Sequence, residues 1–383
     1  MGPLAGLKVI EVAAKGPIPF CAMLLSDLGA EVLRLDRSEQ KPRFPPRDPR
    51  LDFMNRGRRS AAIDLKHPDA SATVLRLVER ADVLIEGFRP GVMERLGLGP
   101  DVCLAQRPSI IYGRATGWGQ SGPLANSPGH DITYLALSGL LDAMRRGDEK
   151  PMPPLNVLGD YAGGGLMLAF GVACAVVEAS KSGRGQVIDA AMIDGVSLFG
   201  TLYHALRAMG QWNEAPGTKV YDTGAPYYDV YRTADGKFMA VGAIEPQFFA
   251  ELARRTGLPD EALEYQNDNT RWPDMKRQLT EIFATRTRDE WCALLEGRDA
   301  CVAPVLSLGE APAHVHHQAR GTFITQDGMA QPAPAPRFSR TPAELKLPPP
   351  IPGEHTTVAL QSWGFSIAEI EQLLAAGTVS ELK

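Results

Sequence analysis

Leu7-Lys8-Val9-Ile10-Glu11-Val12 and Glu31-Val32-Leu33-Arg34-Leu35, with a helical stretch at 18–28 between them, decide the fold. Two short runs rich in Val, Ile and Leu around a helical stretch are the pattern of a strand, a helix and a second strand. The alternation continues with strand-like runs at 61–65, 82–85 and 110–115 and a helical stretch at 68–80. It predicts an α/β fold in which helices flank both faces of a parallel sheet. Ligands on such sheets bind at the carboxyl ends of the strands.

The second half of the chain follows a different pattern. After the turn Ser182-Gly183-Arg184-Gly185 we expect a helix at 188–210 and then a linker rich in Gly and Pro at 210–226. A small α+β domain is predicted next, with a hairpin at 227–233 and 237–242 and amphipathic helices at 246–256, 274–285 and 288–295. Residues 312–352 are rich in proline, so an extended path is expected before a last helix at 367–376.

Composition and charge narrow the class of protein. A length of 383 residues, at about 150 residues per domain, favours two domains. The charged fraction of 22% and the hydrophobic fraction of 44% are typical of a soluble enzyme. A net charge of −5 argues against nucleic acid as a partner. Five cysteines, none spaced C-x-x-C, indicate neither a disulfide framework nor a zinc site and fit a reducing cytoplasm.

Secretion and a membrane span are not expected. Lys8, Glu11 and Lys15 interrupt what would be the apolar core of a signal peptide. The longest uncharged stretch, 161–177, is shorter than the roughly 20 residues of a span. It predicts a buried helix.

Several motifs were tested. No P-loop or G-x-S-x-G string occurs, and no G-x-G-x-x-G string leads from a strand into a helix, so NAD or ATP binding and a nucleophile elbow are not predicted. His314, His316 and His317 lie in a proline-flanked stretch without neighbouring acids, which favours a solvated loop over a metal site. A basic run either grips phosphate or forms a solvent-facing loop. Its members are Arg43, Arg47, Arg50, Arg56, Arg58 and Arg59.

Two residues form a candidate acid/base couple. His130 precedes Asp131 in Gly129-His130-Asp131-Ile132-Thr133-Tyr134, and Asp160 opens a glycine-rich apolar helix. Histidine titrates near neutrality, and a carboxylate at a helix N-terminus is expected to stay ionised. Alternatively, Asp160 is only an N-cap and His130 only a buried, hydrogen-bonded histidine.

Several strings resemble the family III coenzyme A transferases, the CaiB/BaiF superfamily. They are Leu7-Lys8-Val9-Ile10-Glu11, Asp27-Leu28-Gly29-Ala30-Glu31-Val32, the run from Val83 to Val92, and Gly183-Arg184-Gly185-Gln186-Val187-Ile188-Asp189. A second set resembles the branch of that superfamily that racemises 2-methylacyl-CoA thioesters. It comprises Gly129 to Tyr134, Pro154-Leu155-Asn156, Gly159 to Gly165 and Val241 to Phe248. The resemblance runs from Leu4 to beyond Val305 and is less clear in the last eighty residues.

The resemblance implies an interlocked homodimer in which the proline-rich segment straps around the partner. It also implies that the C-terminal helix returns to the large domain. We therefore expect a large CoA-binding domain over 1–190, a linker helix and loop over 191–224, and a small α+β domain over 225–310. A second linker over 311–337 and a C-terminal return over 338–383 complete the chain.

The resemblance also assigns site residues. His130 and Asp160 fall on the two catalytic positions, and Glu245 falls on an acid that hydrogen-bonds the histidine across subunits. The expected CoA contacts are Arg37, Ile63, Asp64, Leu65, Lys66, Gly87, Phe88, Arg89 and Arg95 at the nucleotide, and Gly129, Asp131, Ile132, Thr133 and Tyr134 at the pantetheine and thioester end. No metal or organic cofactor is implied, since CoA is part of the substrate.

The implied reaction is epimerisation at the α-carbon of a 2-methylacyl-CoA, an isomerisation within fatty acid metabolism. His130 takes the proton from one epimer while Asp160 returns one to the opposite face, and the roles reverse for the other epimer. Free N–H groups at the start of the Asp160 helix are expected to hold the enolate oxygen. Glycines 163 to 165 are expected to let the thioester approach this backbone.

Two other functions stay open. A family III CoA-transferase would use Asp160 as the nucleophile that forms an acyl anhydride, and His130 is the residue that separates the two enzymes. A CoA-thioester-binding protein without turnover is the third possibility. The acyl chain is not specified, because apolar side chains at helical spacing are better read as core. Those side chains are Met152, Leu155, Met192, Phe199 and Met209.

Overall fold

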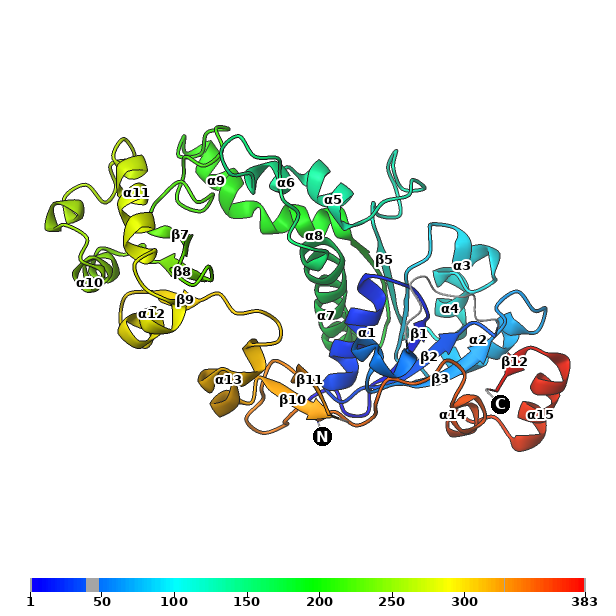
Figure 1. Cartoon of the computed structure of the whole chain (residues 1–383). Helices are drawn as coiled ribbons and strands as arrows, with labels where there is room; N and C mark the ends of the chain where they lie inside the picture. Colours follow the sequence, from blue (N-terminus) through cyan, green and yellow to red (C-terminus); the bar gives the residue numbers. More distant parts are fainter. Residues whose placement is uncertain (1, 39–47, 327, 382–383) are drawn as a thin grey trace. The chain divides into compact units, whose positions relative to one another are not determined.

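The computed structural model describes residues 2–38, 48–326 and 328–381, and the chain forms two compact units (Figure 1). Unit 1 comprises Met1–Ser138, Pro154–Thr201 and Ala333–Lys383, and unit 2 comprises Gly139–Pro153 and Leu202–Pro332. The units therefore interleave along the sequence. The expected large domain over 1–190 differs from unit 1 in two places, since 139–153 belongs to unit 2 and 191–201 to unit 1.

Unit 1 is built on a seven-stranded sheet in the order β12-β3-β2-β1-β4-β5-β6. Its strands are β1 (Lys8–Val12), β2 (Glu31–Asp36), β3 (Arg59–Ile63), β4 (Val83–Glu86), β5 (Ile111–Thr116), β6 (Val187–Ala191) and β12 (Val379–Ser380). All neighbours pair in parallel except β12, which runs antiparallel to β3. The α/β prediction is confirmed.

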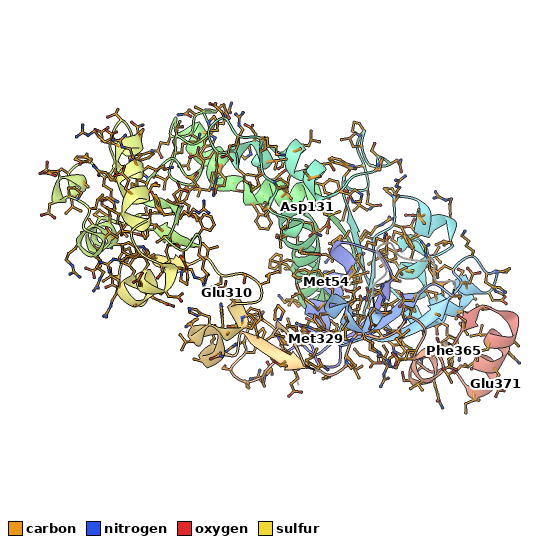
Figure 2. All side chains as sticks on the ribbon, viewed as in Figure 1. Met54, Asp131, Glu310, Met329, Phe365 and Glu371 are labelled. Atoms are coloured by element: carbon orange, nitrogen blue, oxygen red, sulfur yellow. The ribbon has the colours of Figure 1, made fainter. Side chains whose placement is uncertain are left out.

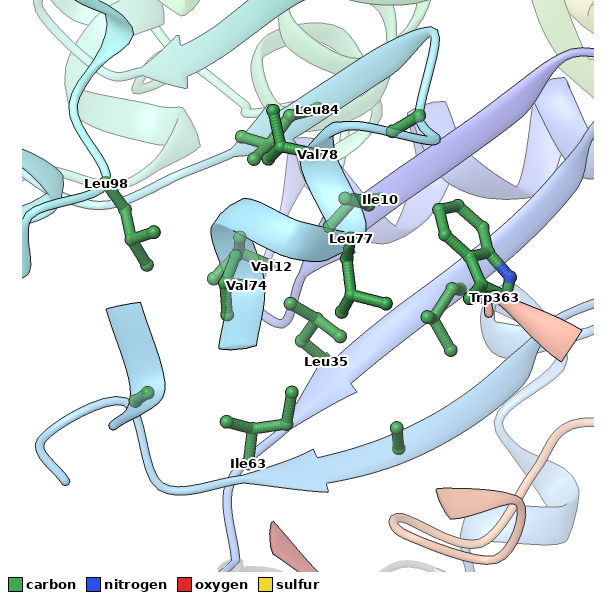
Figure 3. Close-up of a cluster of buried hydrophobic side chains, with 14 of the residues drawn as sticks. Ile10, Val12, Leu35, Ile63, Val74, Leu77, Val78, Leu84, Leu98 and Trp363 are labelled. Carbon is green, nitrogen blue, oxygen red and sulfur yellow. The ribbon is translucent and has the colours of Figure 1, made fainter. Parts of the chain in front are cut away.

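Helices bury both faces of this sheet. Alternate residues of β1 point to opposite faces, as strand geometry requires: Ile10 and Val12 join one core and Val9 the other. The first core packs under α2 (Ala70–Val78), α4 (Pro100–Gln106), α14 (Thr356–Ser362) and α15 (Ile367–Ala376). Figure 3 shows Ile10, Leu35, Leu77 and Trp363 gathered there. The second core packs under α1 (Pro17–Asp27) and α7 (Met167–Ser182).

One predicted element is wrong. The helix expected at 188–210 begins as strand β6, which pairs with β5 in the register Tyr112↔Val187 to Thr116↔Ala191. The chain then forms α8 (Met192–Phe199) and α9 (Thr201–Ala208). A run of five residues is too short for its period to separate a strand from the start of a helix. The free edge of β5 decides in favour of the strand.

Shorter helices and turns complete unit 1. They are η1 (Pro49–Leu51), η2 (Phe53–Asn55), α3 (Val92–Arg95), α5 (Asp131–Ser138) and η3 (Val157–Leu166), a π-helical turn that runs directly into α7. Together η3 and α7 form the single described helical run, Val157–Ser182, that is long and apolar enough to cross a membrane by length and composition. The core helix of a soluble protein passes the same test. One face of α7 packs on the sheet, but Phe170 and Val177 are exposed, so the helix expected to be buried at 161–177 is only partly buried.

Unit 2 is a small α+β body. The predicted hairpin is confirmed as β7 (Tyr228–Arg232) and β8 (Phe238–Gly242), and β9 (Val302–Pro304) adds a third strand. Helices α10 (Pro246–Thr256), α11 (Trp272–Phe283) and α12 (Arg288–Leu295) pack around Tyr231, Met239 and Trp291. The remaining elements are α6 (Leu140–Ala143), η4 (Asp260–Leu263), η5 (Ala311–Ala313), α13 (Val315–Arg320), β10 (Phe323–Gln326) and β11 (Met329–Pro332). Residues 333–355, the rest of the proline-rich segment, contain no helix or strand.

The stretch 210–226 is a folded loop rather than a plain linker. The Lys219 ammonium group lies 3.0 Å from a carboxylate oxygen of Asp222 and 3.1 Å from the carbonyl oxygen of Asn213. It also lies over the ring of Trp212, 4.5 Å from its centroid. One cation thus joins three residues of this loop.

Candidate active site

His130 stands at the entrance of α5. Its carbonyl oxygen accepts hydrogen bonds from the Thr133 amide (2.8 Å) and hydroxyl (2.7 Å), so the helix starts directly after it. The side chain is exposed, and among the described residues its ring has no hydrogen-bond partner. The alternative of a buried structural histidine is therefore wrong.

Asp160 lies inside η3, where it caps nothing. The N-cap position is Asn156, and the amide nitrogen of Asn156 donates to the Asp160 carboxylate at 3.1 Å. A β-carbon added at Gly16, between β1 and α1, would lie 3.4 Å from the carboxyl carbon of Asp160. Asp160 therefore faces the loop that follows β1, at the carboxyl edge of the sheet, and the N-cap alternative is wrong.

The environment of Asp160 differs from the expected one. Burial raises its pKa, the Asn156 hydrogen bond lowers it, the charge of Asp131 raises it, and that of His130 lowers it; the net pKa is above the ordinary value. The backbone N–H groups expected to serve Asp160 and the enolate are occupied. Gly159 and Asp160 donate theirs to one oxygen of Asp131, at 2.6 and 2.8 Å. The N–H groups of Gly159 and Asp160 therefore neither stabilise the ionised Asp160 carboxylate nor remain available for an enolate oxygen, so both of these expectations are wrong.

The glycines after Asp160 serve packing, not access of the thioester. A β-carbon at Gly164 would lie 2.7 Å from Cβ of Pro17 and 2.8 Å from Cγ of Met192. One at Gly165 would lie 2.8 Å from the carbonyl oxygen of Pro17. Helices α1 and α8 thus occupy the space expected for substrate.

Only part of the string from Gly129 to Tyr134 is exposed to a substrate. Asp131, where α5 begins (Figure 2), and Tyr134 are buried, whereas Ile132 and Thr133 are exposed. The Tyr134 ring lies over Gly129, where an added β-carbon would be 2.6 Å from it. Burial, with smaller contributions from Asp160 and Asp131, raises the pKa of Tyr134 to about 12. The exposed side chains of this string next to His130 are Ile132 and Thr133, and the Thr133 hydroxyl is bonded to the His130 backbone.

The expected nucleotide contacts follow β2, β3 and β4, whose carboxyl ends share one edge of the sheet. Arg37, Lys66, Arg89 and Arg95 are exposed cations at that edge. Asp64, Leu65 and Phe88 are partly buried, and Gly87 fits closely against Ala14 and Ile18. Ile63 belongs to the buried core, so a contact with CoA would be made by its backbone. We call these four exposed cations, Arg37, Lys66, Arg89 and Arg95, the cationic fringe; their positive charges are complementary to the phosphates of the expected CoA.

A buried ion pair missed by sequence reasoning shapes this edge. Arg114 on β5 donates at 2.8 Å to Glu86, at the end of β4, and at 2.8 Å to Glu94 on α3. The second Glu86 oxygen accepts the Phe88 amide at 2.6 Å. The loop that carries Phe88 and Arg89 is thereby fixed to β5. The sequence signal that could have revealed this ion pair is the presence of one charged residue, Glu86 or Arg114, in each of two otherwise apolar strands.

The described members of the basic run contact other parts of the protein. Arg56 and Arg58 are buried, so both interpretations are wrong for these two, whereas Arg50 and Arg59 are partly exposed. Arg56 pairs with Asp27 at 2.5 Å, and the buried Arg58 pairs with Glu11 at 2.6 Å. Arg50 pairs with Glu354, and Arg59 donates to Ser362 at 3.4 Å. Arg43 and Arg47 lie outside the described residues.

Two further expectations need correction. His314 caps α13, and its Nε2 lies 2.7 Å from a carboxylate oxygen of Glu296, so the stretch does have a neighbouring acid. Among the described residues, no three His, Cys, Asp or Glu side chains are placed to hold a metal ion. Of the five apolar residues read as core, Met192 alone is buried, and Leu155 and Met209 are strongly exposed.

Glu245 belongs to unit 2. It is the N-cap residue of α10, its side chain makes no capping hydrogen bond, and it is exposed. The structure brings together His130, Asp131 and Asp160 within unit 1, while Glu245 presents a free carboxylate on the other unit.

The fold and the site define an α/β enzyme whose candidate acid/base side chains lie at the carboxyl edge of a parallel sheet. The chain belongs to CoA-transferase family III, whose family model matches residues 4–356. Its fold is that of a CaiB/BaiF family protein from Brucella suis, with a TM-score of 0.80, 25% identity, and coverage of 94% of this chain and 99% of that one.

Curated relatives match nearly the whole chain. Alpha-methylacyl-CoA racemase of Mus musculus is 46% identical over 373 residues, covering 97% of this chain and 96% of its own length. That of Homo sapiens is 45% identical over the same shares. The succinyl-CoA--L-malate CoA-transferase beta subunit of Chloroflexus aurantiacus is 31% identical, covering 94% of this chain and 93% of its own. The resemblance to the superfamily is confirmed.

Proposed function

We propose that this protein is an isomerase that epimerises 2-methylacyl-CoA thioesters at the α-carbon. The observation that carries the proposal is the pairing, within unit 1, of an exposed His130 imidazole with a half-buried Asp160 carboxyl of raised pKa. The identity to racemases, 46% against 31% for the transferase relative, supports the same assignment.

The chemistry uses the two groups in turn. For one epimer the neutral His130 removes the α-proton and the protonated Asp160 delivers another to the opposite face; for the other epimer the ionised Asp160 is the base and the protonated His130 is the acid. A raised pKa suits Asp160 to both roles, because a general acid/base works best when its pKa lies near the working pH. No metal or organic cofactor enters this proposal, and CoA is part of the substrate.

The developing enolate needs donors other than those of Gly159 and Asp160. We propose the first N–H groups of α5, at Asp131 and Ile132, which have no acceptor within their own helix. They directly follow His130, at the positive end of the helix dipole. A preorganised donor of this kind contributes about 3–4 kcal/mol to transition-state stability. The cationic fringe from Arg37 to Arg95 would hold the nucleotide.

We also propose that the working form is an interlocked homodimer in which Glu245 orients His130 across subunits. Unit 1 exposes apolar side chains that a soluble monomer rarely leaves bare: Phe170 and Val177 on α7 are 63% and 55% exposed, and Leu198 on α8 is 56% exposed. The helix-free segment 333–355 would serve as the strap. Exposed thiols at Cys174 and Cys301 fit a reducing cytoplasm, which we propose as the location.

Proton NMR in deuterated water tests the function. A single epimer of a 2-methylacyl-CoA is incubated with enzyme, alone and with a free carboxylic acid as acceptor. We expect loss of the α-proton signal and convergence of the two epimers without an acceptor. Transfer of CoA to the acceptor with retention of the α-proton would instead identify a transferase, and no change in either arm would leave a binding protein.

A further inference from the structure

One carboxylate connects the two proposed acid/base residues. Asp131 directly follows His130 and begins α5, and its Oδ2 accepts the backbone N–H of Gly159 (2.6 Å) and of Asp160 itself (2.8 Å). The start of α5 and the first turn of η3 are therefore joined through a single oxygen atom. The backbone of Asp160 cannot move away from that of His130 without breaking both bonds.

The fit around this carboxylate is close. A β-carbon at Gly159 would lie 2.6 Å from Oδ2 and 2.9 Å from Cγ of Asp131, so only glycine admits the carboxylate at this position. The other oxygen, Oδ1, is buried and has no hydrogen-bond partner among the residues that the structure describes. Leaving a buried charged oxygen unpaired is costly. The Asp131 charge is therefore costly where it lies and calls for a role of its own.

We infer that Asp131 is a positioning residue of the reaction: it fixes Asp160 against the helix that carries His130 and places a negative charge beside the Asp160 carboxyl. This inference rests on the proposed function. It differs from the pantetheine contact implied by the family resemblance, because the Asp131 side chain is buried and accepts hydrogen bonds from the backbone of η3.

Few charged groups act on Asp160 besides Asp131, so the effect of the Asp131 charge on its pKa can be isolated. Asp131 and His130, both at the entrance of α5, are the charged groups that act on it; Asn156 of its own segment donates a hydrogen bond. From α5 comes also the Tyr134 hydroxyl, whose pKa Asp160 raises. The loop before α1 contributes Gly16. On α8 and β6 the acids are Asp194 and Asp189, both exposed, and α7 has none in its first turn.

The sign of the effect follows from the charge. A negative neighbour disfavours the ionised form of Asp160, so Asp131 raises its pKa, and removing the charge lowers that pKa. The acid limb of kcat/KM, which reports protonation of the group with the lower pKa, should then move to lower pH. It should move equally in both directions of epimerisation, because the equilibrium between epimers fixes the ratio of the two kcat/KM values.

Asp131→Asn tests the charge. The Asn side-chain oxygen still accepts both N–H groups, so we expect a folded enzyme with an acid limb at lower pH and a little-changed KM. The matched control is Asp189→Asn, which removes an equal charge and keeps an acceptor for the Gln120 amide, bonded to Asp189 at 2.9 Å, without acting on Asp160. Its pH profile should overlay that of the wild type.

Asp131→Ala and Gly159→Ala test the positioning. Both release η3 from the start of α5, and we expect kcat to fall by about 10²-fold, the usual effect of a reacting group displaced by about an ångström. KM should change much less, since the exposed cations that suit CoA lie elsewhere on the sheet edge. If one alanine variant fails to fold, the other carries the positioning test, and Asp131→Asn tests the charge in either case.

The outcomes separate this inference from the proposed function. If the wild type neither epimerises nor exchanges the α-proton, the proposed function fails. If the wild type does both and the folded Asp131→Asn enzyme has the wild-type acid limb, the charge role is overturned. Wild-type kcat in a folded Asp131→Ala enzyme would overturn the positioning role.

Discussion

At the scale of single residues, the ionisation of Asp160 is set by opposing neighbours. Burial and Asp131 raise its pKa, whereas the Asn156 hydrogen bond and the charge of His130 lower it. Asn156 directly precedes the π-helix that contains Asp160, whereas His130 and Asp131 lie about thirty positions earlier. The contribution of each of these three side chains can be removed by a single substitution.

Asn156→Ala is predicted to move the pH profile opposite to Asp131→Asn. A hydrogen bond to the ionised carboxylate lowers its pKa, so loss of the bond raises that pKa, and the acid limb of kcat/KM shifts to higher pH. The measurement is kcat/KM for one epimer across the acid range. Asn267→Ala, which removes a comparable bond to the Tyr227 hydroxyl in unit 2, is the control and should leave the profile unchanged. A shift of Asn156→Ala to lower pH would contradict this account of Asp160.

Sequence reasoning proposed the two acid/base residues and failed on their surroundings. His130 and Asp160 are visible because their residue types suggest proton transfer. Asp131 was visible only as a neighbour of His130, since its two bonds to Gly159 and Asp160 join segments that are 28 and 29 positions apart. The buried pairs of Arg56 and Arg58 were missed for the same reason, because their acids lie in β1 and at the end of α1.

At the scale of elements, η3 is the part that places Asp160, and three glycines let it pack. Gly163 lies against Val196 of α8, Gly164 touches both α1 and α8, and Gly165 lies against Phe20 of α1. A π-helix is a rare, wider coil that is frequently found at functional sites. Here its tight contacts on two sides hold it in place.

Gly164→Ala is predicted to destabilise the protein despite the better helix propensity of alanine. The added methyl group would lie 2.7 Å from Pro17 and 2.8 Å from Met192, and overpacking of this kind costs about 1–3 kcal/mol. Denaturant unfolding measures the loss. Gly309→Ala is the control, since its β-carbon would meet nothing nearer than 4.0 Å. Equal stability of Gly164→Ala and the wild type would mean that α1 and α8 do not confine η3.

The alternation of strands and helices in the first half predicted the sheet because its periods are local. Local periods were insufficient at β6, where Val187–Ala191 is a strand only because β5 offers it an edge. They were insufficient also at 210–226, which is organised by Lys219 and its contacts to Asp222 and Trp212. The structure of an element that is fixed by partners distant in the sequence cannot be predicted from the element's own residues.

At the scale of the whole molecule, the two units contribute different groups to the proposed reaction. Unit 1 carries His130 and Asp160, and unit 2 carries Glu245 at the exposed start of α10. A dimer with shared sites would also cover the apolar side chains of α7 and α8.

Mixing two inactive variants is predicted to restore activity. When His130→Ala and Glu245→Gln chains are unfolded and refolded together, about half of the dimers are mixed, and each has one site free of both lesions. Activity should therefore approach about one quarter of that of the refolded wild type, whereas each variant refolded alone stays inactive. Confirmed heterodimers without recovered activity would show that both residues serve the same subunit's site.

The central claim is that two residues move the α-proton, one on each face of the same carbon. Its most direct test is the rate of α-deuterium incorporation from each pure epimer of a 2-methylacyl-CoA, measured for the wild type, His130→Ala and Asp160→Asn. The account predicts that epimerisation falls by about 10²- to 10⁴-fold in each variant, while binding of the CoA ester is retained. Wild-type incorporation with both epimers in either folded variant would contradict it.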